Sequence, residues 1–257
     1  GNPKAPVVEA QPLAMMVPTV ALALLAVIEG ILPTTLFSGL TTVLIPTLSC
    51  LTKQDASRRI ETAFEAGVLI SAFFAMLLFL TGKDLGHMLY GEEKAGIYLR
   101  FIAPFSAIIG LHLIGSASLN GLGLQNKALV NQCVGNVVML ILTYILPRMP
   151  EFRMFGYLIA LGTNFILTGV LHMIACVRHT GMKLSYMRLI VLPLFCVAVS
   201  ALITIFMTNL LSMTYGLTAL LLQSAMAGAA FIILAYSADL FTPFLEYLPK
   251  RQARKAG

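Results

Sequence analysis

The chain has 257 residues, of which 58% are hydrophobic and only 11% are charged. A soluble domain carries about 25% charged residues, so this chain has too few charges to cover a surface in water, and its surroundings must be largely lipid. The net charge of +6 does not indicate nucleic-acid binding, because the basic residues stand in short clusters between apolar runs, as the positive-inside rule predicts.

The apolar runs are about 20 residues long, which is the length of a transmembrane helix and not of a strand in a membrane barrel. We therefore predict an all-α fold, a polytopic transmembrane helical bundle of about seven spans, between an extracytoplasmic loop or linker at 1–13 and a basic cytoplasmic tail at 239–257. The predicted spans are residues 14–50, 62–82, 97–119, 128–147, 155–177, 186–209 and 214–238.

The first predicted span, 14–50, is longer than a bilayer requires, because a continuous helix of this length would measure about 55 Å against a hydrocarbon core of about 30 Å. Pro33 and Pro46 lie within it, and we expect breaks or hinges at these prolines. The same run contains Glu29. A carboxylate at the bilayer centre costs about 2.5–3.5 kcal/mol, so Glu29 either binds a proton or cation inside the membrane or lies at the outer interface, one turn before Pro33.

The third span, 97–119, has Arg100 near its outer end. Its guanidinium could meet a pyrophosphate, which it suits geometrically, or it could reach out to the lipid headgroups. The connection that follows, NGLGLQNK, is short. In it, Asn120 or Gly121 is expected to take the left-handed conformation that ends a helix, and Asn126 is expected to cap the next one.

The fourth span carries a line of polar residues. Gln132, Asn136 and Thr143 are four and seven residues apart, so they share one helical face. This face could line a polar cavity that binds sugar hydroxyls, or it could dock on a neighbouring helix, where such hydrogen bonds average about 0.6 kcal/mol. Asn164 in the fifth span is the expected partner. His112 and His172 are expected to be hydrogen-bonded between helices.

No spacing in the chain indicates an enzyme or a metal site. The sequence lacks a nucleophile elbow, a Walker A loop and an HExxH motif, and its four cysteines and four histidines do not have the spacing of zinc ligands. We therefore predict that the chain is not an enzyme and has no catalytic residue, no metal and no cofactor. Its work would be binding and conformational change.

The distribution of Lys and Arg predicts the orientation. With seven spans, eleven of these residues fall on the side of the C-terminus and six on the other side, so the C-terminus is expected in the cytoplasm. The chain begins at Gly1 in a polar stretch with no basic region before an apolar one, which does not match a signal peptide. An odd number of spans starting outside is typical of the second part of a longer membrane protein.

The stretch LPTTLFSGLTTVLIPTLSCL resembles the helix that opens the second lobe in the multidrug/oligosaccharidyl-lipid/polysaccharide exporter superfamily. There, a proline-containing span ends in a cytosolic P-x-L-S followed by charged residues. The likeness continues through 88–146, with LYG before a span and an LNGLG turn after it, and is greatest to the polysaccharide transporter branch. The matching residues of the first motif are Pro46, Leu48 and Ser49, followed by Lys53, Arg58 and Arg59.

The resemblance implies about fourteen spans in two pseudo-symmetric lobes, of which this chain would be the C-terminal one. It implies alternating-access transport of lipid-linked sugars across the cytoplasmic membrane, without ATP, for the cell envelope or for sporulation. The implied partners are the lipid-linked sugar, the missing N-terminal lobe or a second copy, and membrane lipids, with no nucleic acid. Two other functions stay open: a cation-coupled multidrug antiporter of the same superfamily, and a non-transporting membrane scaffold for cell-wall enzymes.

Overall fold

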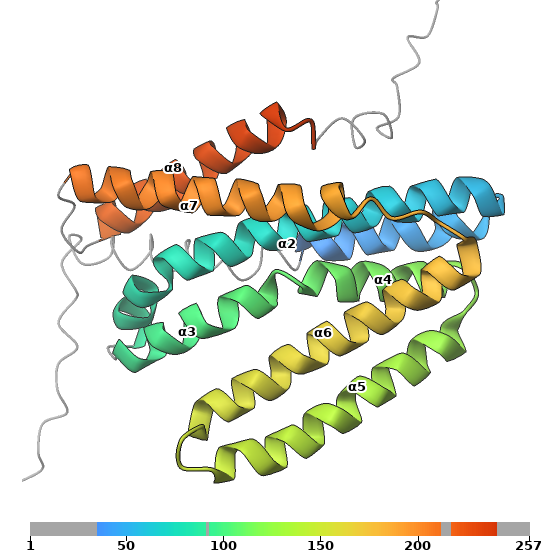
Figure 1. Cartoon of the computed structure of the whole chain (residues 1–257), viewed down its shortest axis with the longest axis horizontal. Helices are drawn as coiled ribbons and strands as arrows, with labels where there is room; N and C mark the ends of the chain where they lie inside the picture. The colour runs from blue at the N-terminus through green and yellow to red at the C-terminus, as the bar shows by residue number, and fades with distance from the viewer. Residues whose placement is uncertain (1–34, 91–92, 212–216, 241–257) are drawn as a thin grey trace, which may run out of the picture.

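The computed structural model describes residues 35–90, 93–211 and 217–240 (Figure 1). Every regular element in these ranges is helical, which confirms the predicted all-α bundle. Glu29, Pro33, the loop at 1–13 and the tail beyond residue 240 lie outside the described residues, so the expectations placed on them stay predictions.

The described helices follow one another with short connections. After the helix Thr35–Ser49 come α2 (Lys53–Tyr90), α3 (Glu93–Ser106), α4 (Ile109–Gly121), α5 (Gln125–Ile145), η1 (Leu146–Arg148), α6 (Arg153–Thr180), η2 (Met187–Val191), α7 (Leu192–Leu210) and α8 (Leu217–Ser237). Within the described ranges, five helices are long and apolar enough to cross a membrane, or six if the bent pair α3–α4 is one span. The chain is therefore a multi-pass membrane protein.

Helix α2 is the centre of the lobe. It packs against α3 and α4 on one side and against α7 and α8 on the other, while α5 and α6 form a hairpin beyond α4 (Figure 1). Of the most apolar 18 residues of α2, 72% are buried within the molecule, against 6% in α5. Hydropathy alone therefore does not distinguish a helix that is buried inside the molecule from one on its surface.

Two predicted spans differ from the structure. The span predicted at 62–82 is the middle of α2, which has 38 residues and extends past the apolar run into charged residues at both ends. The span predicted at 97–119 is two helices, α3 and α4, that meet at 44°. Pro104 lies inside α3 and has no N–H to continue the helical hydrogen bonds. At the break, the Ser71 Oγ of α2 donates to the Ala107 carbonyl oxygen at 2.6 Å.

The turn after α4 corrects a prediction. Gly123 takes the left-handed conformation, with φ +74°, in place of Asn120 or Gly121. Gly121 serves close packing, since a Cβ there would lie 2.9 Å from the Leu48 Cβ. The predicted cap by Asn126 is also wrong, because α5 begins without a side-chain cap.

Pro46 does not interrupt its helix. The described helix runs through Pro46 to Ser49, three residues further on, and the Ser49 hydroxyl donates to the Pro46 carbonyl oxygen at 2.8 Å. The break predicted at Pro46 is therefore absent from this described helix.

Helices α2 and α4 meet backbone to backbone at Gly67 and Gly110. A Cβ on Gly110 would collide with the Gly67 carbonyl group, and a Cβ on Gly67 would lie 2.7 Å from Ile114 Cγ1. In lipid, helices associate by such close contact between small residues, because there is no hydrophobic force to hold them together. This contact places the break between α3 and α4 directly against α2.

We predict that Gly110→Ala lowers stability by about 1–3 kcal/mol, the usual effect of overpacking. Helix propensity alone would predict the opposite, since alanine is the better helix former by about 1 kcal/mol. The matched control is Gly228→Ala in α8, where the added Cβ would lie 3.8 Å from Phe73 Cζ, an ordinary contact. Thermal unfolding in nanodiscs measures both, and a Gly110→Ala protein as stable as the control would contradict the close packing.

Candidate functional site

The structure brings together three of the predicted site residues. Asn136 Oδ1 on α5 accepts a hydrogen bond from Gln132 Nε2, one turn away, at 3.0 Å. The same oxygen accepts from Asn164 Nδ2 of α6 at 3.3 Å, and this amide also contacts Met139 Sδ at 3.6 Å. We call Gln132, Asn136 and Asn164 the amide cluster. Thr143, which was predicted on the same face, is not part of it, and its buried hydroxyl has no partner.

The amide cluster runs from the interior of the lobe to its surface. Asn164 is only 7% exposed, whereas Asn136 is exposed. Around Asn136 the surface of α5 is apolar, with Val137 54% and Leu140 69% exposed. A polar group facing hydrocarbon costs several kcal/mol when it is unsatisfied. The exposed edge of the cluster therefore fits a surface covered by water or by another protein segment better than one covered by lipid tails.

Gly135 lets α5 approach α6 beside the cluster. A Cβ at this position would collide with Thr168 Cγ2 and lie 2.5 Å from Asn164 Oδ1. This oxygen is buried and has no hydrogen-bond partner. The cluster thus keeps one unused acceptor at its inner end and exposed amide groups at its outer end, which is an arrangement able to bind hydroxyl groups.

Helix α6 carries a polar stripe that the sequence reasoning missed. Its members are spaced by four, lie on one face and are all buried: Asn164, Thr168, His172, Cys176 and Thr180. The spacing of four was visible in the sequence, and it places residues on one helical face. Asn164 and His172 were predicted separately, and their common face was not.

The two inner histidines do hydrogen-bond between helices. His112 Nδ1 lies 2.9 Å from Thr168 Oγ1, and His172 Nε2 lies 3.3 Å from the Ala128 carbonyl oxygen. Their rings are stacked, with centroids 5.5 Å apart and an angle of 21° between the planes. Neither the stacking nor the contact between these two residues followed from their positions in the sequence.

Arg100 is bound to the backbone of α2 and not to the amide cluster. Its Nε donates to the Phe79 carbonyl oxygen at 3.0 Å and its Nη2 to that of Leu80 at 3.4 Å. The guanidinium also lies 5.8 Å from the centre of the Phe79 ring. These contacts attach α3 to α2, and the side chain remains exposed, so a headgroup or a pyrophosphate could still reach it.

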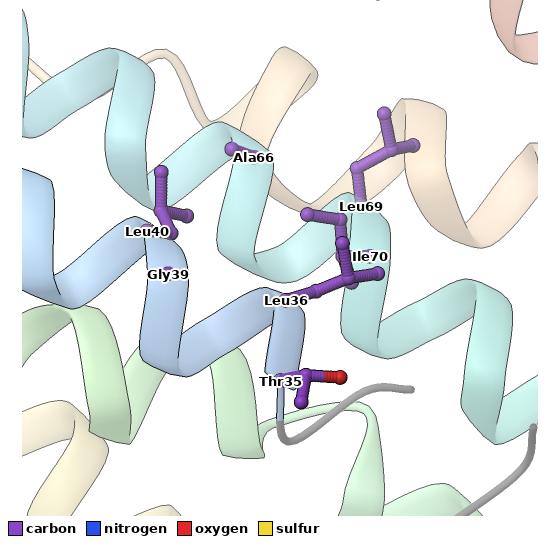
Figure 2. Close-up of a pocket in the computed structure, with 7 residues that line it drawn as sticks. All are labelled: Thr35, Leu36, Gly39, Leu40, Ala66, Leu69 and Ile70. Carbon is purple, nitrogen blue, oxygen red and sulfur yellow. The ribbon is translucent and has the colours of Figure 1, made fainter. Parts of the chain in front are cut away.

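An apolar pocket lies between the helix Thr35–Ser49 and α2 (Figure 2). Its volume is about 440 Å³, and among its described lining residues only Thr35 has a polar side-chain group. Such a lining suits a hydrocarbon chain and offers almost nothing to a sugar. The lining residues are Thr35, Leu36, Gly39, Leu40, Ala66, Leu69 and Ile70.

Comparison with known proteins finds one informative relative. Over 145 residues, 55% of this chain, the sequence is 26% identical to Stage V sporulation protein B of Bacillus subtilis (strain 168). Within the polysaccharide transporter branch, this is also the protein that the quoted motifs resemble most, so the resemblance is confirmed. The match covers only 28% of the relative, which agrees with a chain that corresponds to one lobe. No family model and no solved structure matches the chain.

We predict a measurable coupling between Asn136 and Asn164. In a double-mutant cycle with Asn136→Ala and Asn164→Ala, the interaction should be about 0.6 kcal/mol and at most about 1.7 kcal/mol, the range for hydrogen bonds between membrane helices. Unfolding of the four proteins in nanodiscs gives this value. Strictly additive effects would mean that the hydrogen bond between α5 and α6 is absent in the membrane.

Proposed function

We propose that this chain is one lobe of a membrane carrier that moves a lipid-linked oligosaccharide or polysaccharide precursor across the cytoplasmic membrane by alternating access. The observation that carries the proposal is the similarity to Stage V sporulation protein B, in a chain whose described part is a bundle of membrane-spanning helices. The chain would act by binding and conformational change and not as an enzyme, and it would support cell-envelope or spore biogenesis.

The two halves of such a substrate have matching surfaces on the lobe. The amides of exposed Asn136 and half-buried Gln132 can donate to and accept from sugar hydroxyls. The apolar pocket against α2 can hold part of the lipid tail, because about 440 Å³ of apolar volume is available there. The bent pair α3–α4 provides a non-helical segment, of the kind that carriers use at membrane depth where it is covered by protein or borders a cavity.

The amide cluster also indicates where a second lobe would lie. In carriers built from repeats, the substrate site lies between the repeats. A lobe on its own would expose Asn136 to lipid, so we expect α5 to face a partner across a wet cavity. The partner would be the N-terminal lobe or, less well suited, a second copy of this chain.

We expect no transport by this chain alone and robust transport when it is reconstituted with an N-terminal lobe, because one lobe presents half of the site. The assay follows a fluorescent lipid-linked sugar in vesicles. Asn136→Leu should fold normally, because the residue is exposed, and should reduce the rate of flipping at least about tenfold, the effect of losing 1.4 kcal/mol of binding. The matched control is Val137→Leu, which changes the next residue and should keep the full rate.

Flipping by a monomer of the chain alone, shown to be monomeric by crosslinking, would contradict the two-lobe reading. Normal flipping by the Asn136→Leu carrier would remove the amide cluster from the substrate path.

The structure also sharpens the prediction of orientation. The connections at 50–52, 122–124 and 181–186 lie at one end of the lobe, the right-hand end in Figure 1, and the connection at 149–152 lies at the other. Among described residues, the first end has more basic residues. They are Lys53, Arg58, Arg59, Lys127, Arg178, Lys183 and Arg188, against Lys83, Lys94, Arg100, Arg148 and Arg153 at the other end.

We therefore expect Gln54 to face the cytoplasm and Glu151 the outside. Both are exposed, whereas Ala56, two residues further along α2, is 1% exposed and unsuited to labelling. In a protein with the exposed Cys50 and Cys133 replaced by serine, an impermeant thiol reagent should label Glu151→Cys in intact cells and Gln54→Cys only after lysis. The reverse pattern would overturn the orientation.

A further inference from the structure

The stacked histidines form a polar centre inside the lobe, where α4, α5 and α6 meet. His172 is completely buried, and His112 is half-buried. Gly115 makes room for the pair, since a Cβ on it would lie 2.6 Å from the His172 Cβ. The rings lie 5.5 Å apart and nearly parallel. A change in the charge of one ring therefore changes the electrostatic energy of the other.

The hydrogen bonds fix the proton positions on both neutral rings. Thr168 has one hydroxyl hydrogen, and it donates this hydrogen to the backbone carbonyl oxygen of Asn164 at 2.6 Å. The Thr168 oxygen must then accept from His112, so Nδ1 of His112 carries its proton and Nε2 is bare. His172 faces a carbonyl oxygen with Nε2, so that nitrogen carries the proton. Its Nδ1 is bare, buried and without a partner.

The pair thus offers two bare nitrogens that can accept a proton, and it can hold only one. A second proton would place two positive charges on stacked rings, and like charges at this distance strongly disfavour each other. Protonation of either ring therefore excludes protonation of the other. His112 is the half-buried ring that reaches the surface of the molecule, and buried His172 is the second acceptor.

Among the described residues, the groups found in contact with the pair carry no charge. On α6 the next titratable group is the Cys176 thiol, one turn away, which donates to the Gly115 carbonyl oxygen at 3.9 Å. On α5 the pair meets the Ala128 carbonyl group, while the neighbouring Lys127 is exposed. Phe165 of α6 packs beside His112, and α2 presents Phe64 next to Gly115.

The position of His112 connects this centre to the break in the helix. His112 lies in the first turn of α4, which begins at Ile109 directly after the break. The N-terminal end of a helix carries a partial positive charge, so an imidazolium there is destabilising. A proton on His112 would therefore disfavour the present first turn of α4, which follows the break where the Ser71 hydroxyl of α2 donates to the Ala107 carbonyl oxygen.

We propose that the His112–His172 pair is a proton-binding site and that the proton is the coupling ion of this carrier. Water at the His112 side gives up one proton, the bare imidazole nitrogen takes it to form an imidazolium, and the bent pair α3–α4 relaxes. The proton returns to water on the opposite side when the lobe has changed its conformation. The coupling half of this proposal rests on the proposed transport function, whereas the binding of one proton does not.

The first experiment measures the protons themselves. The chain has four histidines, so His87→Gln with His179→Gln leaves only the pair. Nitrogen NMR of this protein, labelled at histidine and held in nanodiscs, should show Nδ1–H on His112 and Nε2–H on His172 at high pH. On acidification the pair should take up one proton in total. Thr168→Val should change the tautomer of His112 and leave that of His172 unaltered.

Two outcomes of this titration would overturn the proton site. In one, both rings stay neutral down to the pH at which the protein unfolds. In the other, two protons bind independently. His172→Gln, examined in the same background, gives a further check, because His112 should then bind its proton without competition.

The second experiment separates the coupling from the transport function. In vesicles containing the two-lobe carrier, a gradient of one pH unit should bias the distribution of a fluorescent lipid-linked sugar up to about tenfold per coupled proton. His112→Gln should abolish this bias, and the control His179→Gln should keep it. Flipping that ignores the pH gradient would overturn the coupling and leave the proposed function intact. No flipping under any condition, with one proton still binding to the pair, would overturn the proposed function and support the proton site.

Discussion

The fold of this lobe depends on the close packing of α2 against α4 at Gly67 and Gly110. In lipid, apolar side chains gain little from leaving their solvent, so helices are held by contact between small residues and by a few hydrogen bonds. The two glycines bring the backbones together, and the Ser71 hydroxyl reaches the carbonyl group at the helix break beside them. One side of α2 packs against α4 in this way, and its other side packs against α7 and α8.

The polar groups that we propose to bind substrate and proton lie on α4 and on the α5–α6 hairpin. Asn164, Thr168 and His172 belong to one buried stripe of α6, so this stripe runs from the amide cluster to the histidine pair. Thr168 lies between them, since its hydroxyl contacts both the backbone carbonyl group of Asn164 and the His112 ring. A change of charge at the histidines and a change of ligand at the amides would therefore act on the same helix.

The sequence predicted the helical class and the contact of Asn164 with the polar face of Gln132 and Asn136, because hydropathy and helical spacing follow from local chemistry. It did not predict the full length of α2, whose ends are charged, or the break between α3 and α4. Contacts between segments that are distant in the chain could not be predicted from the sequence either. The histidines that stack are 60 residues apart in the chain.

We expect the exposed edge of the amide cluster to border water and not lipid. The most direct measurement of this is how fast a water-soluble reagent reaches cysteines placed on α5. Asn136→Cys is compared with Ile141→Cys, which is exposed on the opposite face of the same helix, in a carrier with Cys50 and Cys133 replaced by serine. A water-soluble thiol reagent should modify the cysteine at 136 rapidly, and a lipid-linked sugar should slow this reaction, while the cysteine at 141 stays unmodified. Equal, slow modification of both cysteines would show that lipid covers this edge and would contradict the account.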